Sequence, residues 1–350
     1  KNQKELIKIT TNYIKSVTSD LKSRNDVGYI VSGAIDSTLI SLIACEFLNN
    51  EKNQNMKFFT LTFDDKDLPA KIAEKIMINK TKKHQIINVD KEEYLKNLTF
   101  LYKSLSIPMP THSFPSYSIL CENAVKSKCR ILVGGEGADE IYNGYSLYKE
   151  IKKGKSLNSG SLSPYSSLED KYQLFSKEIN NLKNSSDLFK SYEFISDKND
   201  NWITKVEKSL FLDAFIQCPS TGLFCVDQVG GLWGIESRSP LANPFAIAWR
   251  FLNLPIQDSN DFYDEKKILR NELSKHSKIW DLNSPTKQGF SGYPNEIFNF
   301  KDLKKHALVI NDIFNISLLN LEKNFGKRDF DWKIYNLGKF IEENSELLNL

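Results

Sequence analysis

Cysteine and histidine are scarce in this chain, which has five cysteines and four histidines among its 350 residues. No C-x-x-C pair occurs and the histidines are scattered, so the sequence does not predict a zinc site. The cysteines are odd in number and irregularly spaced, which argues against a disulfide framework. Reduced thiols are typical of cytoplasmic proteins, and we expect that location here.

Long apolar runs and strong charge are also missing. No uninterrupted apolar stretch approaches the roughly 20 residues that span a bilayer, and the first residues lack the apolar block of a secretory signal. The net charge of +3 is too small to favour a nucleic-acid partner. With 40% hydrophobic and 26% charged residues, the composition is that of a globular protein, long enough for two lobes.

Apolar strands and amphipathic helices alternate through the first 150 residues. The pattern predicts buried strands at 27–31, 57–63, 84–89 and 129–133, and helices at 1–24, 38–48, 67–80, 91–105 and 118–128. The proline-containing stretch 106–117 is expected to be a loop. The alternation predicts an α/β fold with a doubly wound, mostly parallel sheet of about five strands and helices on both faces.

The remainder of the chain is predicted to be mainly helical. We expect an α/β core at 1–150, a variable and partly mobile insertion at 151–201, and a mainly helical part at 202–350 that completes the substrate and phosphate site. The last part is expected to contain a buried helix at 202–218, a charged helix at 264–274, and two or three C-terminal helices with Trp332 and Tyr335 in their core.

The turn 31–37, with the sequence VSGAIDS, joins the first predicted strand to the helix that follows. The free N–H groups at the start of that helix and its positive end would form a cradle for an anion. A carboxylate inside the cradle, Asp36, would be unfavourable beside a bare polyphosphate and therefore suggests a magnesium ion. The alternative is an ordinary strand–turn–helix with a capping serine.

A second turn, 134–140, has the sequence GGEGADE and follows the strand at 129–133. Three glycines and three acidic residues suit neither a core nor a helix interior. Ligands bind at the carboxyl ends of the strands in such sheets, so both turns are expected to face one ligand. A phosphate with magnesium would satisfy both turns, whereas solvated carboxylates in a plain turn are the alternative.

Together the two turns resemble the asparagine synthetase class of N-type ATP pyrophosphatases. SGAIDS is similar to the family's SGGxDS pyrophosphate loop, and GGEGADE with the following Asn143-Gly144-Tyr145 is similar to its SGEGxDE…GGY segment. The strand-end sequence FTLTF falls where the family has its adenine-side strand. The stretches at 227–243, 264–274 and 286–290 resemble its D-R…E-x-R-x-P-F-L-D, K-x-x-LR and K-x-x-F motifs, so the resemblance covers about residues 5–295.

The chain departs from the family pattern at a few positions. Ala34 replaces the second loop glycine, Gln228 stands where arginine is usual, and Gly230-Gly231 replaces larger residues. Residues 241–243 read LAN instead of FLD. Most of these departures fall in the 227–243 stretch, so they bear on the identity of the substrate more than on the use of a nucleotide.

The resemblance implies ATP and Mg²⁺ as cofactors and a role for each matching residue. It makes Glu136 the base that deprotonates the attacking amine, and it places Lys287 against the nucleotide phosphates. Asp36 and Asp139 would hold Mg²⁺. The K-x-x-LR lysine is Lys266 or Lys267, and an ordinary charged helix is the alternative there. The expected contacts with ATP and pyrophosphate come from Ile30, Ser32, Gly33, Ala34, Asp36, Ser37, Leu61, Gly134, Gly135, Tyr145 and Lys266.

The activity that the resemblance implies is an AMP- and pyrophosphate-forming amide ligase. It would adenylate a small or tethered carboxylate and transfer the acyl group to ammonia or an amine. Only about 24 residues precede the first strand, too few for a glutaminase domain, so the nitrogen is expected to be ammonia, ammonia from a partner protein, or a substrate amine.

Three other functions remain open. One is an intramolecular cyclase of the β-lactam synthetase or peptide-ring-closing type. Another is a degenerate nucleotide-binding scaffold, which the methyl group of Ala34 would favour if it blocked the loop. A tRNA-thiolating relative is disfavoured because the chain has no paired cysteines and no basic patch.

Overall fold

The computed structural model describes residues 2–52, 56–64, 67–78, 80–81, 83–145, 148, 202–253, 265–278 and 297–348. The predictions for 151–201 and for the turn 286–290, with Lys287, therefore lie outside the described residues. The three-part division of the chain stays a prediction.

Five parallel strands form one sheet in the order β3-β2-β1-β4-β5. The strands are β1 Val27–Ile30, β2 Lys57–Thr62, β3 His84–Asn88, β4 Ile131–Val133 and β5 Glu236–Arg238. The predicted α/β class with a doubly wound parallel sheet is confirmed. The strand β5 comes from the part of the chain expected to be helical, and it pairs with β4 along its whole length.

Helices connect and cover the strands. They are α1 Asn2–Leu21, α2 Ile35–Lys52, α3 Leu68–Met77, α4 Lys91–Leu105, α5 Ser113–Lys126, α6 Ala138–Ile141, α11 Trp202–Leu212, the π-helical segment η3 Asp213–Leu223, α12 Phe224–Leu232, α13 Pro244–Asn253, α14 Lys267–His276, α15 Phe300–Phe314, α16 Leu318–Glu322, α17 Arg328–Glu343 and α18 Ser345–Leu348. The prediction of a loop up to residue 117 is wrong, because α5 begins at Ser113. Its Pro115 lies in the first turn, where the missing N–H group leaves no hydrogen bond unmade.

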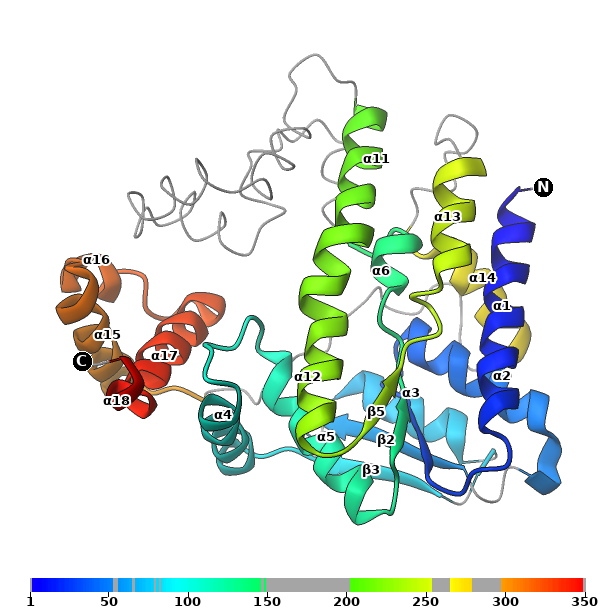
Figure 1. Ribbon diagram of the computed structural model, residues 1–350, viewed down its shortest axis with the longest axis horizontal. Coiled ribbons are helices and arrows are strands. Elements are labelled where there is room, and N and C mark those ends of the chain that lie inside the picture. Colours follow the sequence, from blue (N-terminus) through cyan, green and yellow to red (C-terminus); the bar gives the residue numbers. More distant parts are fainter. Residues whose placement is uncertain are drawn as a thin grey trace.

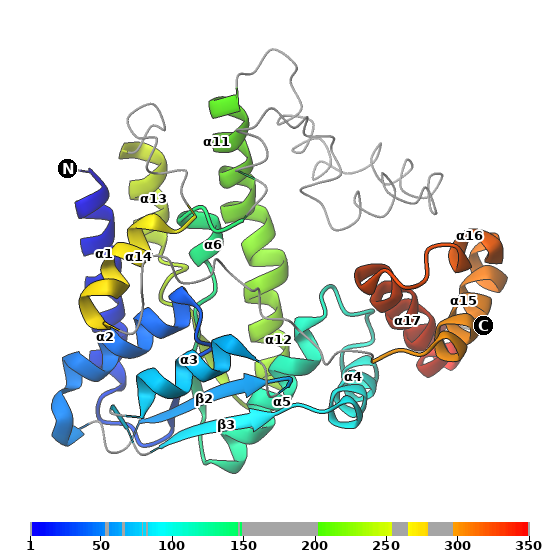
Figure 2. The ribbon, with the colours of Figure 1, turned by 180° about the vertical axis from the view of Figure 1, so that it is seen from behind.

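The central strands β1, β2 and β4 are buried on both faces of the sheet, and alternate residues of these strands enter two different cores. Phe58 and Ile131 pack in a core with α1, α2 and α14, whereas their neighbours Phe59 and Leu132 pack in a core with α4, α5 and α12. Figures 1 and 2 show the first group of helices beside α13, and the second group on the side of α12. Because helices cover both faces of the sheet, the ends of the strands are left uncovered.

One long helix runs through α11, η3 and α12 without a break (Figure 1). Its segment Val206–Leu232 is long and apolar enough to cross a membrane, by length and composition only. A core helix passes the same test, and α12 contacts α4, α5 and β5 while η3 contacts α6. These contacts make the helix a wall of the globular fold.

A buried asparagine attaches the C-terminal helices to the rest of the protein. Asn336 of α17 accepts hydrogen bonds from the Tyr102 hydroxyl at 2.9 Å and from the Met109 backbone N–H at 3.1 Å. Its amide nitrogen donates to the Met109 carbonyl at 3.1 Å. A single side chain therefore pairs both backbone groups of Met109, in the connection between α4 and α5.

We predict that Asn336→Ala destabilises the protein by roughly 2–4 kcal/mol, because it leaves the Met109 backbone groups and the Tyr102 hydroxyl buried without partners. Urea unfolding followed by circular dichroism measures this change. Asn320→Ala, at an exposed position in α16, is the matched control and should change the stability by less than about 0.5 kcal/mol. Equal effects of the two substitutions on stability would contradict the stabilising role of the Asn336 hydrogen bonds.

Candidate functional site

The two predicted turns leave neighbouring strands at the same edge of the sheet. β1 and β4 pair in parallel, and the strand order reverses between them. The turn 31–37 follows β1 and the turn 134–140 follows β4. Crevices at such reversal points are the usual ligand sites of doubly wound sheets.

Serine hydroxyls close the first turn. The Ser32 N–H donates to Oγ of Ser37 at 3.0 Å, and the two hydroxyl oxygens lie 2.8 Å apart. The left-handed backbone of the turn falls on Gly33, with φ +76°, where a Cβ would lie 1.8 Å from the Pro69 carbonyl oxygen. Ala34 is not among the described residues with positive φ, and its N–H donates to Oγ of Ser32 at 3.3 Å. The methyl group of Ala34 thus requires no left-handed backbone.

The second turn packs directly on the first. A Cβ on Gly135 would lie 3.0 Å from both Cβ of Asp36 and the Ser37 nitrogen, so a side chain at 135 would push the two turns apart. Gly137 is the N-cap of α6 with φ +91°, and a Cβ there would lie 2.7 Å from Cα of Ala242. Glycine at 135 and 137 therefore allows the turns and the segment after β5 to meet.

A buried lysine joins the two turns. The Lys266 ammonium lies 2.5 Å from Oδ2 of Asp36 and 2.7 Å from Oδ1 of Asp139, and only 3% of the lysine side chain is exposed. Burial alone would lower the pKa of Lys266, but the two carboxylates outweigh burial and hold that pKa above its usual value. The lysine stays charged, and the group of three side chains carries a net charge of about −1.

The backbone around this ion group is tightly constrained. Lys266 caps α14 with φ +51°, and its N–H donates to the Tyr142 carbonyl at 3.2 Å. A Cβ on Gly144 would lie 1.8 Å from Oδ1 of Asp139 and 2.2 Å from Cε of Lys266. Of the two lysines that match the K-x-x-LR motif, Lys266 is therefore the one that the fold places at the site.

The donor set fits a magnesium ion that is completed by phosphates. Asp36 and Asp139 lie close enough to share one cation, since both contact the Lys266 ammonium. Among the described residues no group of three or more metal-binding side chains occurs, so the protein alone offers too few ligands for a closed site. Magnesium commonly binds through one or two carboxylates together with substrate phosphates, and this pair meets that requirement.

Glu136 lies between these carboxylates and the segment that follows β5. The Ser239 hydroxyl donates to its Oε2 at 3.4 Å, and a Cβ on Gly134 would lie 2.4 Å from the same oxygen. Burial raises the pKa of Glu136, and the charge of Asp36 acts in the same direction. A carboxylate with a raised pKa is better suited to accept a proton than an ordinary surface carboxylate.

Two tyrosine–carboxylate pairs lie behind the ion group, and the sequence did not indicate them. The Tyr145 hydroxyl donates to Oε1 of Glu140 at 2.6 Å, and the Tyr148 hydroxyl donates to Oδ2 of Asp213 at the start of η3. Burial raises the pKa of Glu140 to about 7, with a further contribution from Asp139, and burial raises that of Asp213 to about 7. Tyr145 is predicted to contact the nucleotide, but in the structure its hydroxyl donates to Glu140.

The two residues predicted to contact the adenosine lie on the strands β1 and β2, and the predicted Glu236–Arg238 pair lies on β5. Ile30 ends β1 and Leu61 is buried in β2, where the resemblance places the adenosine. Glu236 and Arg238 form a 2.5 Å ion pair on β5, with about half of each side chain exposed (54% and 53%). An exposed pair of this kind contributes little to stability.

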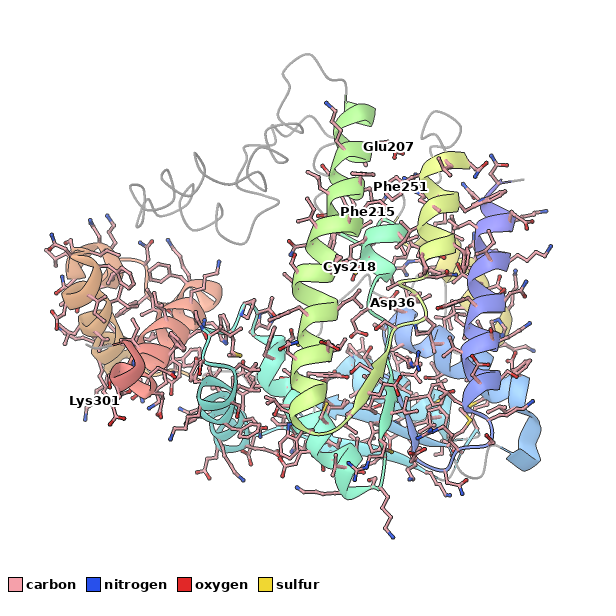
Figure 3. All side chains as sticks on the ribbon, in the orientation of Figure 1. Asp36, Glu207, Phe215, Cys218, Phe251 and Lys301 are labelled. Carbon is pink, nitrogen blue, oxygen red and sulfur yellow. The ribbon has the colours of Figure 1, made fainter. Side chains whose placement is uncertain are left out.

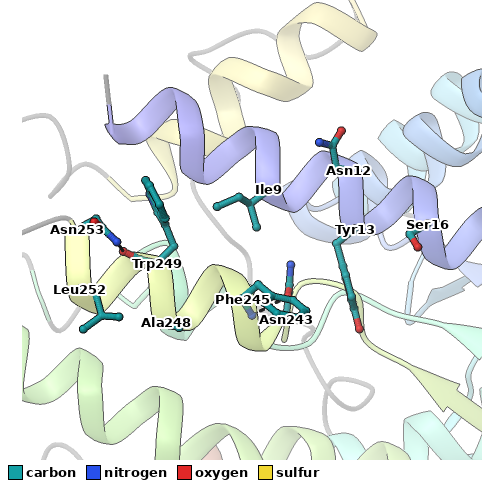
Figure 4. Close-up of a pocket in the computed structure, with 10 residues that line it drawn as sticks. All are labelled: Ile9, Asn12, Tyr13, Ser16, Asn243, Phe245, Ala248, Trp249, Leu252 and Asn253. Atoms are coloured by element: carbon teal, nitrogen blue, oxygen red, sulfur yellow. Dashed lines mark hydrogen bonds between the residues drawn. The ribbon is translucent and has the colours of Figure 1, made fainter.

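A groove of about 610 Å³ lies elsewhere, between α1 and α13 (Figure 4). Tyr13, Phe245, Trp249 and Leu252 are among its lining residues, and none of the lining residues is charged. The groove therefore has no charged side chain that could offset the charge of a polyphosphate.

Comparisons with known proteins identify the family of this chain. The family model described as asparagine synthase matches residues 11–311. The chain is 29% identical over 136 residues to asparagine synthetase (glutamine-hydrolyzing) 1 of Bacillus subtilis, covering 39% of this chain and 21% of that protein. It is 26% identical over 143 residues to the putative asparagine synthetase (glutamine-hydrolyzing) 1 of Methanocaldococcus jannaschii, covering 39% of this chain and 24% of that protein. The matched part thus spans about a fifth to a quarter of these relatives.

The Asp213 carboxyl makes the stability of the protein depend on pH. Its pKa of about 7 exceeds the ordinary value of 3.8, so the folded state binds the proton more tightly than the unfolded state. The stabilisation is complete below about pH 4 and is lost as the pH rises towards 7.

We predict that Asp213→Asn, which stays neutral, unfolds at least about 2 °C above the wild type at pH 8, with little difference at pH 4.5. Thermal unfolding from pH 4.5 to 8 measures the difference. A difference in unfolding temperature that does not change with pH would contradict the raised pKa of Asp213.

Proposed function

The chain belongs to the asparagine synthase family, and from this membership we propose that it is an ATP-dependent amide ligase. It adenylates a substrate carboxylate, releases pyrophosphate, and transfers the acyl group to ammonia or an amine with release of AMP. The observation that carries this proposal is the meeting of Asp36, Asp139 and Lys266 at the ends of β1 and β4, with Glu136 beside them.

In the first step a carboxylate oxygen attacks the α-phosphorus of ATP, and the bond from that phosphorus to the pyrophosphate oxygen breaks. Both reactants are anionic, so the transition state needs fixed positive charge and aimed N–H groups. The free N–H groups at the start of α2, in the turn that contains Ser32 and Ser37, would bind the departing pyrophosphate. The Lys266 ammonium supplies positive charge to the same place.

The same arrangement would hold the metal ion that accompanies ATP. Asp36 and Asp139 would bind Mg²⁺ together with the phosphates, and the bound ion would supply charge compensation for the phosphate oxygens. Lys287 remains the predicted phosphate-binding lysine, outside the described residues.

In the second step the nitrogen lone pair forms a C–N bond with the acyl carbon. The acyl C–O bond to AMP breaks, AMP leaves with that electron pair, and the nitrogen must lose a proton. Glu136 is the base in this proposal, because it lies on the turn that carries Asp139 and its raised pKa favours proton acceptance. The names of the matched relatives include glutamine hydrolysis, whereas for this chain we propose ammonia or an amine as the nitrogen source.

ATP–pyrophosphate exchange with a panel of carboxylates, including aspartate, tests the first step. We predict exchange with at least one of them, and a loss of about 100-fold or more in Asp36→Asn and Lys266→Met, because each removes a charge that acts on the phosphates. Lys275→Met, at an exposed position of α14, is the matched control and should keep wild-type exchange. No exchange with any carboxylate, together with no ATP binding, would rule out the proposed activity.

Glu136→Gln separates the two steps. The variant should keep exchange within about threefold of the wild type and form amide about 100-fold more slowly, because only the second step requires a base. Single-turnover assays that follow pyrophosphate and amide separately measure the two rates. Equal losses in both steps would refute the role of Glu136 as the base.

A further inference from the structure

A cation from the protein itself already pairs with both carboxylates that are proposed as magnesium ligands. The Lys266 ammonium lies 2.5 Å from Oδ2 of Asp36 and 2.7 Å from Oδ1 of Asp139. The lysine side chain is 3% exposed, and the two aspartate side chains are 15% and 17% exposed. Figure 3 labels Asp36, which lies in the first turn of α2. Any other cation that binds these two carboxylates has to compete with a buried ammonium at hydrogen-bonding distance.

The fold itself brings the ammonium to this place. Lys266 is the N-cap of α14 and has a left-handed backbone with φ +51°. Its side chain packs on Gly144, where a Cβ would lie 2.2 Å from Cε of the lysine and 1.8 Å from Oδ1 of Asp139. At the other end of α14, Nδ1 of His276 lies 2.7 Å from Oε2 of Glu46 in α2. Because α14 contacts α2 at both ends, packing fixes the backbone from which the lysine side chain extends.

The charges of these three groups oppose the binding of a further cation. The two carboxylates carry a charge of −2, and the ammonium reduces this to about −1. Like charges repel strongly where little water separates them, so Lys266 would weaken the binding of a divalent ion to Asp36 and Asp139. Two carboxylates are also an incomplete ligand set for magnesium unless phosphate oxygens are added to it.

We propose that Lys266 competes with the divalent metal ion for Asp36 and Asp139, so that the protein binds this ion firmly only together with the nucleotide phosphates. The inference rests on the proposed function and concerns the control of its metal site. Phosphate oxygens offer the ammonium another anionic partner, and the flexible four-carbon stem of lysine allows the ammonium to move to them. The two carboxylates then become available to the metal. Nucleotide binding and metal binding therefore favour one another.

Binding of Mn²⁺ in the absence of nucleotide tests the competition. Mn²⁺ is the probe because electron paramagnetic resonance measures its free concentration, and oxygen ligands suit Mn²⁺ and Mg²⁺ alike. Lys266→Met changes the charge of the group from about −1 to −2, so we predict that this variant binds Mn²⁺ about tenfold or more tightly than the wild type. Lys275→Met, whose side chain is 65% exposed on the same helix, is the matched control and should bind Mn²⁺ as the wild type does.

Two further variants show which groups hold the probe. Adding Asp36→Asn to Lys266→Met should return Mn²⁺ binding to the wild-type level or below, because one of the two carboxylates is then lost. Lys266→Gln removes the charge but keeps N–H donors for the carboxylates, and it should bind Mn²⁺ about tenfold or more tightly as well. The glutamine variant carries the test where the methionine variant does not fold.

Thermal unfolding provides a second measurement. Lys266→Met buries two carboxylates without their ammonium, so it should unfold below the wild-type temperature in the absence of metal. Addition of Mg²⁺ to about 1 mM should raise the unfolding temperature of the variant by about 3 °C or more, and that of the wild type by less than about 1 °C. Lys275→Met should respond to Mg²⁺ as the wild type does.

Two results would overturn the inference and leave the proposed function intact. One is a wild type that binds Mn²⁺ as tightly as the Lys266 variants do. The other is tighter binding in Lys266→Met that persists when Asp36→Asn is added, since the probe would then be held elsewhere. Both measurements are made without ATP, so their outcome is independent of ATP–pyrophosphate exchange, whose absence with every carboxylate would instead refute the proposed function.

Discussion

The organisation of the site depends on one buried lysine between two carboxylates. Lys266 lies 230 residues after Asp36 in the sequence, yet its ammonium is 2.5 Å from that carboxylate and 2.7 Å from Asp139. Removing an ammonium group from water is unfavourable, and one carboxylate at moderate distance does not offset it. Two carboxylates at hydrogen-bonding distance do, so α14 and the two turns are held together as one unit.

The parts of the fold that could be predicted are those with strong local signals. The strands β1 to β4 are short apolar runs between polar segments, and the turns after β1 and β4 carry glycine and acidic residues that no core would accept. Parallel pairing then brings both turns to one edge of the sheet, so the pairing of Asp36 and Asp139 in one site followed from the topology.

The rest depends on partners that are distant in the sequence. The strand β5 has the sequence Glu-Ser-Arg, which shows no apolar pattern. It is a strand because it pairs with β4, and that pairing is not visible in its own sequence. Lys266 caps α14, a charged helix whose sequence is typical of a solvated surface. Asp213 and Tyr148 come from separate segments, and neither residue signals that the other is its hydrogen-bond partner. Long-range pairs of this kind leave no local period or turn signal in a sequence.

Contacts within this chain explain two of the departures from the family pattern. Gly230 lies against Ser237, and Asn243 accepts a hydrogen bond from the Phe245 N–H at the start of α13. Such residues are adjusted to one another, so they say little about a ligand.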